Sequence, residues 1–225
     1  MSQLAPPAFI LYPKQATFGR HLPKNKIYEH SGASTQLKNL FIEQVEQIVW
    51  QYKLSPETVN LPAKPGVPEL QIFTIELKTE ELNLKVLHCI DGAVQFPIIF
   101  ELRFDGRTKV IAAYKYPSES DASVWKLSDY FATAWFSSDM ERAAMPLALD
   151  LGGLYEQVLH RLMPTTARQQ ESLLELVVRV EQVVAKQRKV DKTAGELVKE
   201  KQFNRKVEIN ATLRQLKTEL EQLSR

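Results

Sequence analysis

Apolar residues recur at steps of three and four between positions 34 and 54, which predicts one apolar face of a helix. The residues on this face are Leu37, Leu40, Phe41, Val45, Ile48, Val49 and Tyr52. Ser34 or Thr35 would cap the first turn by accepting a backbone N–H, and the proline after Ser55 would end the helix. A similar apolar face predicts another helix over residues 149–162.

Two stretches on either side of Asp105-Gly106 give the clearest strand prediction. Residues 97–104 and 108–116 are rich in β-branched and aromatic residues, and the Asp-Gly pair suits the positive φ angles of a tight hairpin turn. The stretch 70–78 predicts a further strand, and one or two more are expected between 123 and 136. These elements predict an α+β body with a mixed or antiparallel sheet flanked by helices.

The segments between these elements give weaker patterns. Proline steps in the first thirty residues favour an irregular loop that lies on the body. A short helix is expected over residues 80–90, ended by Asp91-Gly92. The prolines between positions 62 and 68 predict a connecting loop.

From Arg168 onward the chain contains no proline, and its one aromatic residue is Phe203. Two apolar seams with alternating steps of four and three indicate a helical hairpin or coiled coil. They comprise Leu173, Val177, Val180 and Val184, and then Ile209, Leu213, Leu216, Leu220 and Leu223. Between them the same register falls on polar residues such as Gln187, and Gly195 lies in this gap. We therefore predict a turn near residues 189–195, with one continuous helix as the alternative.

The chain thus divides into a predicted body, residues 1–165, and a predicted C-terminal helical hairpin or coiled coil, residues 166–225. With 225 residues, 44% of them hydrophobic, the body can bury a sizeable core. From residue 168 onward, thirteen lysines and arginines oppose nine acidic residues, while the rest of the chain carries a small negative charge. Neither part is basic enough to indicate nucleic acid on its own, and the basic stretch 186–206 is typical of a solvated helix face.

The composition favours a cytoplasmic protein. The only cysteine, Cys89, lies in an apolar stretch, which predicts a buried thiol and excludes an internal disulfide. The N-terminal residues lack a basic segment and are interrupted by prolines, unlike a signal peptide. No apolar run approaches the roughly 20 residues that span a bilayer. We expect no contact with a membrane.

The pair Glu76 and Lys78 offers one candidate for chemistry. On a strand both side chains share a face, as in metal-dependent nucleases, where the carboxylate binds Mg²⁺ and the lysine orients the attacking water. That chemistry needs a second acidic ligand, and the only acidic residue nearby in the preceding segment is Glu69. A nuclease-like protein is therefore a weak alternative, and ordinary charges on an exposed strand are favoured.

No other pattern predicts catalysis. Charges at Glu101, Arg103, Asp105 and Lys115 are expected to pair across the surface of the hairpin. The four histidines lack the mutual spacing of a metal site, and no glycine-rich phosphate loop is present. We predict no catalytic residue, no metal ligand and no cofactor, which favours a protein that is not an enzyme.

Aromatic side chains gather in one region between positions 125 and 136. They are Trp125, Tyr130, Phe131, Trp135 and Phe136. Bases could stack on such a group, although aromatic residues in strands more often form core. Core is the favoured interpretation.

A second candidate for binding lies in the tail. Phe203 is the one large ring there, and basic residues surround it. The candidate residues for a partner or for nucleic acid are Lys199, Lys201, Phe203, Arg205 and Lys206. Phe203 would either fill a gap where the tail helices meet the body or anchor a partner.

Several segments together resemble one family. They are Leu-Pro-Lys at 22–24, Trp-Gln-Tyr-Lys-Leu-Ser-Pro-Glu-Thr at 50–58, Glu-Leu-Lys at 76–78, Ile-Asp at 90–91, Phe-Pro-Ile-Ile-Phe at 96–100, Ala-Leu-Asp-Leu at 148–151, Leu-Tyr-Glu at 154–156 and Gln-Phe-Asn-Arg-Lys-Val-Glu-Ile-Asn at 202–210. The sequence resembles the bacterial and archaeal family called domain of unknown function 4391. Members of this family are often encoded beside DNA helicases and DNA methyltransferases of restriction or phage-defence systems, and the resemblance implies the same setting for this chain. It names no activity.

These observations favour an accessory, non-enzymatic protein of a prokaryotic DNA modification, restriction or phage-defence system that acts through protein–protein contacts. Its expected partners are a helicase or a methyltransferase, or a second copy through the C-terminal helices. A nucleic-acid-binding module that uses the basic C-terminal region is the first alternative. The nuclease-like protein is the second.

Overall fold

The computed structural model describes residues 8–118, 121 and 124–224. The chain forms two compact units, Met1–Leu162 and Met163–Arg225, here called the body and the hairpin. The body is built on a mixed sheet with helices, and the hairpin is a pair of long helices. The predicted α+β class with a C-terminal helical hairpin is therefore confirmed.

The sheet of the body runs in the order β2-β3-β4-β5-β6-β7. Its strands are β2 (Thr17–His21), β3 (Val45–Leu54), β4 (Leu70–Leu77), β5 (Ile98–Phe104), β6 (Arg107–Pro117) and β7 (Trp125–Ala132). β4 and β5 are parallel and are joined through a helix, whereas the other neighbours are antiparallel. The short β8 (Phe136–Ser137) also pairs with β6. Apart from this sheet, β1 (Ile10–Leu11) pairs with β9 (Ala143–Ala144).

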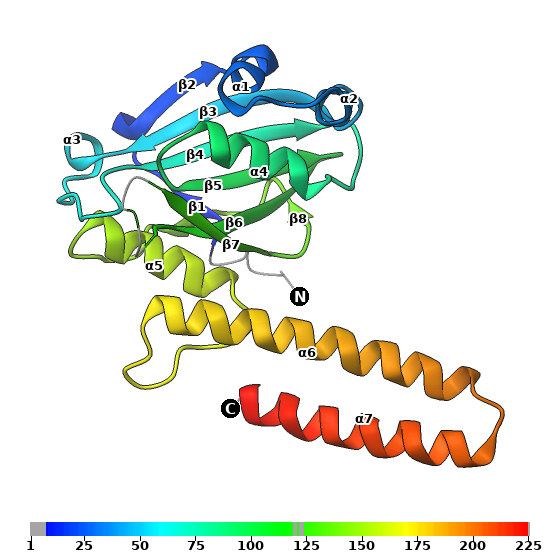
Figure 1. Cartoon of the computed structure of the whole chain (residues 1–225). Helices are drawn as coiled ribbons and strands as arrows, with labels where there is room; N and C mark the ends of the chain where they lie inside the picture. Colours follow the sequence, from blue (N-terminus) through cyan, green and yellow to red (C-terminus); the bar gives the residue numbers. More distant parts are fainter. Residues whose placement is uncertain (1–7, 119–120, 122–123, 225) are drawn as a thin grey trace. The chain divides into compact units, whose positions relative to one another are not determined.

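Helices cover the sheet (Figure 1). On one face lie α1 (Lys24–Ser31), α2 (Thr35–Gln44) and α4 (Leu84–Ala93), whose buried side chains Ile27, Phe41, Val86, Leu87 and Ile90 pack against the strands. α5 (Leu151–Leu162) contacts β6 and β7. The short η1 (Lys14–Ala16) and α3 (Pro56–Val59) lie beside β3. The main core therefore lies between α1, α2, α4 and the sheet.

The predicted helix over 34–54 is wrong in its second half. Ser34 caps α2 as expected, because its side chain accepts the backbone N–H of Leu37 at 3.3 Å. The helix ends at Gln44, and the chain continues as β3. β3 has a register shift between Val45 and Gln47, so Val45 and Ile48 both face the core although they are three residues apart. A bulged strand therefore reproduces the spacing of a helix.

The first thirty residues also differ from the prediction. In place of an irregular loop, residues 8–31 form β1, η1, β2 and α1. The predicted helix over 80–90 exists but is displaced, because Asn83 caps it by accepting the backbone N–H of Lys85 and the helix continues through Gly92. The predicted hairpin is confirmed as β5 and β6. Asp105 and Gly106 take φ angles of 47° and 70° in its turn.

The second unit consists of α6 (Leu173–Lys199) and α7 (Phe203–Ser224) packed against each other. A capping box of Ser172 and Glu175 begins α6. The hairpin is as predicted, but its turn lies at residues 200–202 and not near 189–195. Val190 is buried, so the seam of α6 continues through the stretch where the predicted register became polar.

Candidate functional site

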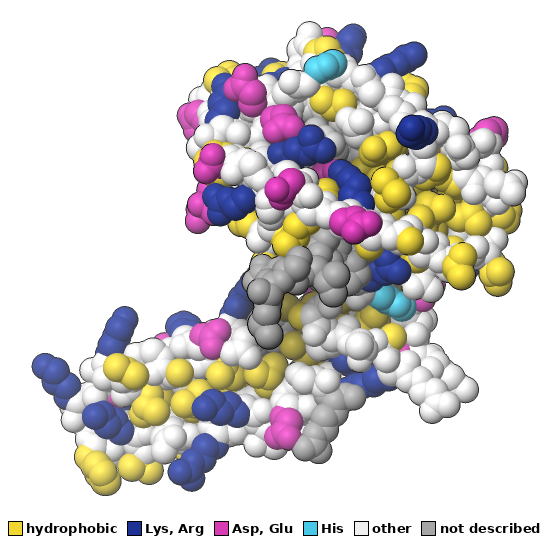
Figure 2. All heavy atoms as spheres, turned by 180° about the vertical axis from the view of Figure 1, so that it is seen from behind, with side chains coloured by type: hydrophobic (Ala, Val, Ile, Leu, Met, Phe, Trp, Pro, Cys, Tyr) yellow, Lys and Arg dark blue, Asp and Glu magenta, His cyan; other side chains and the backbone are white. Residues whose placement is uncertain are grey.

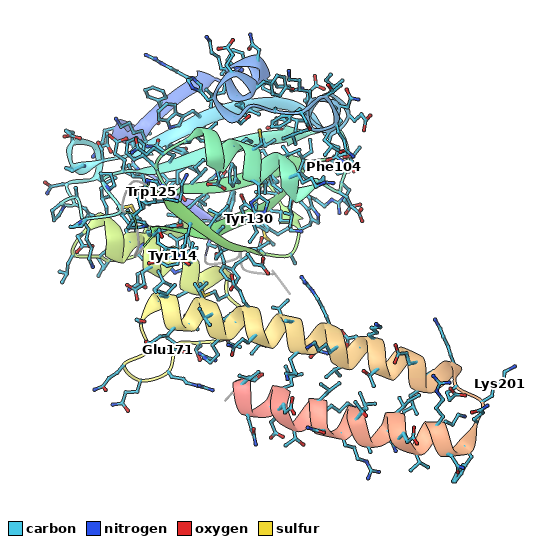
Figure 3. All side chains as sticks on the ribbon, in the orientation of Figure 1. Phe104, Tyr114, Trp125, Tyr130, Glu171 and Lys201 are labelled. Carbon is cyan, nitrogen blue, oxygen red and sulfur yellow. The ribbon has the colours of Figure 1, made fainter. Side chains whose placement is uncertain are left out.

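The turn between α6 and α7 gathers the binding residues predicted from the sequence. We call residues 198–207 the hairpin tip. Phe203 begins α7 and is 77% exposed, and Val198 and Val207 are 85% and 55% exposed. Lys199, Lys201, Arg205 and Lys206 are also exposed. Figure 2 shows hydrophobic and cationic side chains side by side at this end of the hairpin, and Figure 3 labels Lys201 in the turn.

Local hydrogen bonds fix the shape of this turn. The Glu200 carboxylate accepts the backbone N–H groups of Lys201 at 2.7 Å and Gln202 at 2.9 Å. These hydrogen bonds, from Gln202 and Lys201, lower the pKa of Glu200 below its usual value. Glu200 also pairs with Arg205 at 3.4 Å. The tip therefore presents its apolar and basic side chains beside a turn that the Glu200 side chain holds in place.

A cavity of about 540 Å³ lies in the body, where the end of α4 meets β6 and β7. It is lined by His88, Asp91, Gly92, Ala93, Val94, Gln95, Lys115, Trp125, Lys126 and Leu127. Trp125 and Tyr130 both come from β7, and their positions can be followed in Figure 3. Both an acidic and a basic side chain of this cavity, Asp91 and Lys115, are buried.

Asp91 and Lys115 belong to one hydrogen-bond network. The Lys115 ammonium donates to the backbone carbonyls of Asp91, at 2.5 Å, and of Val94. These carbonyls belong to the C-terminal end of α4, where a positive charge is favourable. Tyr130 donates its hydroxyl hydrogen to the Asp91 carboxylate. From the α5 side, Tyr155 accepts the backbone N–H of Lys115 at 3.0 Å.

Burial changes the acidity of both charged groups. It raises the pKa of Asp91 to about 7, against the opposing effects of the Tyr130 hydrogen bond and the Lys115 charge. Burial also lowers the pKa of Lys115, and the charge of Asp91 opposes this shift. A carboxyl group of this kind can change its charge near neutral pH, which is unusual for aspartate.

Comparison with known proteins identifies the family but not the activity. The sequence pattern of a family described as a domain of unknown function, DUF4391, matches residues 10–220. The chain belongs to this family. No curated protein and no solved structure matches it. None of the helices in the described part of this DUF4391 protein is long and apolar enough to cross a membrane.

The pair proposed for a nuclease-like protein has other partners in this DUF4391 protein. Glu76 pairs with Arg103 at 3.5 Å, and Lys78 donates to the Ile42 carbonyl at 3.0 Å and lies 3.7 Å from Glu46. Within residues 8–118, 121 and 124–224, no three His, Cys, Asp or Glu side chains are placed to hold a metal ion. The nuclease hypothesis therefore gains no metal site from the described residues, and it stays a prediction.

The expected surface pairing across the β5–β6 hairpin is wrong for Glu101 and Lys115, although Arg103 lies 3.7 Å from the Glu101 carboxylate. Glu101 is buried and binds Arg142 through both carboxylate oxygens, at 2.6 and 2.7 Å. Arg142 also donates to the Ile10 carbonyl at 2.8 Å. Lys115 is buried in the α4 network described above. The sequence prediction treated Glu101 as exposed because its partner, Arg142, lies 41 residues later in the chain.

The cluster of the buried Asp91 and Lys115 with the partly buried Tyr130 was not predicted as a site. Asp91-Gly92 was interpreted only as the end of a helix. The sequence signal that could have revealed this cluster was Asp91 itself, because an aspartate within an apolar helix such as α4 needs a partner for its carboxylate. Two other predictions are confirmed: Cys89 is buried, and Phe131 and Phe136 belong to the core. Trp125, Tyr130 and Trp135 are only partly buried.

Proposed function

We propose that this DUF4391 protein works by docking onto another protein through the hairpin tip. The observation that carries this proposal is the exposure of Val198 at the end of α6 and of Phe203 and Val207 at the start of α7. Large apolar side chains that gather on an exposed surface are characteristic of interaction sites. Aromatic anchors of this kind also supply much of the energy of protein interfaces.

The charge of the tip defines the partner surface that would fit. Lys199, Lys201, Arg205 and Lys206 oppose one acidic residue, Glu200, within residues 198–207. The complementary surface is an apolar pocket for Phe203 with an acidic rim around it. An anchor that buries fully is worth about 1.5–3 kcal/mol, which corresponds to a change in affinity of roughly ten- to hundredfold.

The resemblance described above supplies the biological setting of the proposal. It favours a cytoplasmic accessory subunit of a prokaryotic DNA modification, restriction or phage-defence system, with a helicase or a methyltransferase as the partner. The absence of a recognisable catalytic constellation in the sequence is consistent with an accessory role. The hairpin would then be the docking element of the protein.

The experiment is co-purification of the tagged full chain with each helicase and methyltransferase encoded beside its gene. Phe203→Glu should abolish recovery of the partner, because it places a carboxylate in an apolar pocket with an acidic rim. Leu147→Glu is the matched control, since Leu147 is 95% exposed on the body. Equal recovery of the partner with both variants would show that the tip is not part of the interface.

A second copy of the chain is the other protein that could occupy the tip. Light scattering of the full chain after size-exclusion chromatography distinguishes this case. A dimer that dissociates with Phe203→Glu and persists with Leu147→Glu would assign the tip to self-association. A monomer in all three samples, together with loss of the enzyme partner for Phe203→Glu, would assign it to a different protein.

Nucleic acid is the alternative partner, and the exposed lysines of the tip favour it. Each phosphate neutralised on duplex DNA adds about 0.9 to the slope of log affinity against log salt. Joint replacement of Lys199, Lys201 and Lys206 by alanine should then reduce that slope by up to about 3. Phe203→Ala would change affinity for duplex DNA little, whereas it would weaken a protein interface strongly. This contrast separates the two alternatives.

A further inference from the structure

β7 forms one edge of the sheet in the body, as Figure 1 shows. Among the described residues it pairs along one side only, with β6. An edge strand leaves main-chain N–H and C=O groups unpaired, and an extended peptide can add to such an edge as a further strand. All residues of this edge belong to the body, so it is a different surface from the hairpin tip.

The hydrogen-bond pattern shows which main-chain groups of β7 are open. In an antiparallel pair, alternate residues direct their N–H and C=O groups toward the partner strand and away from it. Ser118 donates its N–H to the Val124 carbonyl at 2.7 Å, so Val124 faces β6. By this alternation Trp125 and Leu127 direct their N–H and C=O groups away from β6. Pro117, which lies opposite Trp125 and has no N–H, agrees with this assignment.

The open edge is short because a bulge follows it. After Leu127 the register of β6 and β7 shifts, and the Ser128 hydroxyl accepts the Tyr114 N–H at 2.8 Å. A bulge of this kind bends an edge strand and limits its pairing with another strand. The regular part of the edge that a partner could extend is therefore residues 125–127.

The side chains on the two faces of this edge differ in character. Trp125 and Leu127 lie on the same face of the sheet as Lys115, toward α4, and both line the cavity of about 540 Å³. Lys126 lies on the opposite face with Tyr116, its partner in β6, and is exposed. Directly opposite residues on neighbouring strands share a face, so an added strand would continue this alternation.

The charge of Lys126 defines the partner that fits. A second copy paired through residues 125–127 about a two-fold axis would bring the two Lys126 side chains directly opposite each other, and like charges in that position are destabilising. An acidic residue in the same position is stabilising. Its two neighbours in the added strand would face Trp125 and Leu127 on the cavity side, where apolar side chains pack favourably.

We propose that the β7 edge binds an extended segment of another protein as an added strand, with an acidic residue opposite Lys126 and an apolar residue on either side of it. Main-chain hydrogen bonds to Trp125 and Leu127 hold the segment in place. Lys126 selects its charge, and the cavity beside α4 gives room for its apolar side chains.

Selection from a phage-displayed library of random peptides of about ten residues, the length of a long strand, tests the proposal on the full chain. Enriched peptides should share an acidic residue between two apolar residues. Lys126→Glu should weaken binding of a synthetic enriched peptide by about three- to tenfold, because like charges then oppose each other. Replacing the acidic residue of the peptide by lysine should restore its binding to this variant.

Methylation of successive main-chain nitrogens of the peptide tests for the added strand. Every second N–H of a bound strand faces β7, so affinity should fall by about tenfold or more at one position and change little at the next. Lys38→Glu is the matched control, since it makes the same charge change at another exposed lysine of the body. Neither this variant nor Phe203→Glu at the hairpin tip should change peptide affinity.

The proposal would be overturned by a selection that enriches no peptide, by an affinity that Lys126→Glu leaves unchanged, or by methylation losses that do not alternate. Light scattering of the full chain addresses the second copy. A dimer that becomes tighter with Lys126→Gln, which removes the repulsion between two lysines, would assign the edge to self-association and would also overturn the proposal.

Discussion

Replacing Asp91 by asparagine should remove a pH-dependent cost of folding. Burial raises the pKa of this carboxyl from an ordinary 3.8 to about 7 in the folded protein. As the pH rises from about 4 to about 7, the unfolded chain therefore releases a proton that the folded chain retains. The unfolded state then binds fewer protons, so the free energy of unfolding decreases over this window and is level above it.

The magnitude follows from the shift. At 1.36 kcal/mol per pKa unit, a rise from 3.8 to about 7 corresponds to about 4 kcal/mol. Asparagine keeps the shape and an acceptor for the Tyr130 hydroxyl but has no charge to desolvate. The Lys115 charge, which opposes the shift, loses its favourable interaction in the variant. Relative to the parent, the variant should therefore gain stability as the pH rises from 5 to 8.

Urea unfolding followed by tryptophan fluorescence measures this difference, because all three tryptophans lie in the body. Other titrating groups contribute alike to the parent and the variant, so the difference between their pH curves isolates Asp91. Asp105→Asn is the matched control, since Asp105 is exposed and asparagine tolerates its positive φ of 47°. Parallel curves for the parent and Asp91→Asn between pH 5 and pH 8 would refute the reasoning.

Three further substitutions test side-chain contacts within the body and within the hairpin. Tyr155→Phe removes a hydroxyl that is bonded twice to the β6 backbone, and it should lower the free energy of unfolding of the body by about 1–3 kcal/mol in urea. Arg142→Met removes the bidentate partner of the buried Glu101 and should cost about 3 kcal/mol, much of which Glu101→Gln in the same chain should restore. Leu213→Ala leaves a gap at the buried seam of α7 and should lower hairpin stability by about 2–5 kcal/mol, measured as faster amide exchange in α7 but not in the body. Unchanged unfolding or exchange in any of the three would contradict the role given to that side chain.

The parts of the fold that depend on local sequence could be predicted. The Asp105-Gly106 turn, the capping of α2 by Ser34 and the paired helices of the tail each follow from residues close together in the chain. β3 could not be predicted in this way, because its bulges place Val45 and Ile48 on one face at helical spacing. Only the pairing with β2 and β4 makes this stretch a strand, and that pairing is a tertiary contact.

The same distinction applies to the candidate sites. The residues of the hairpin tip are consecutive in the chain, at 198–207, so their proximity is visible in the sequence. Asp91, Lys115 and Tyr130 come from α4, β6 and β7, and only the folded sheet brings them together. Lys115 showed no sequence signal for burial, because its partners are backbone carbonyls that carry no residue identity. A site of this kind requires coordinates.

The corrected register of the hairpin explains why its tip is apolar. In α6 the seam passes through Val190 and, at heptad spacing, Leu197, so Val198 is rotated about 100° away from α7. The α7 seam, counted back from Leu213 by the same steps, falls on Lys206 and Gln202. Phe203 and Val207 therefore lie one position off it. Packing of the hairpin requires none of these three exposed apolar side chains, which is the physical reason to look for a partner at the tip.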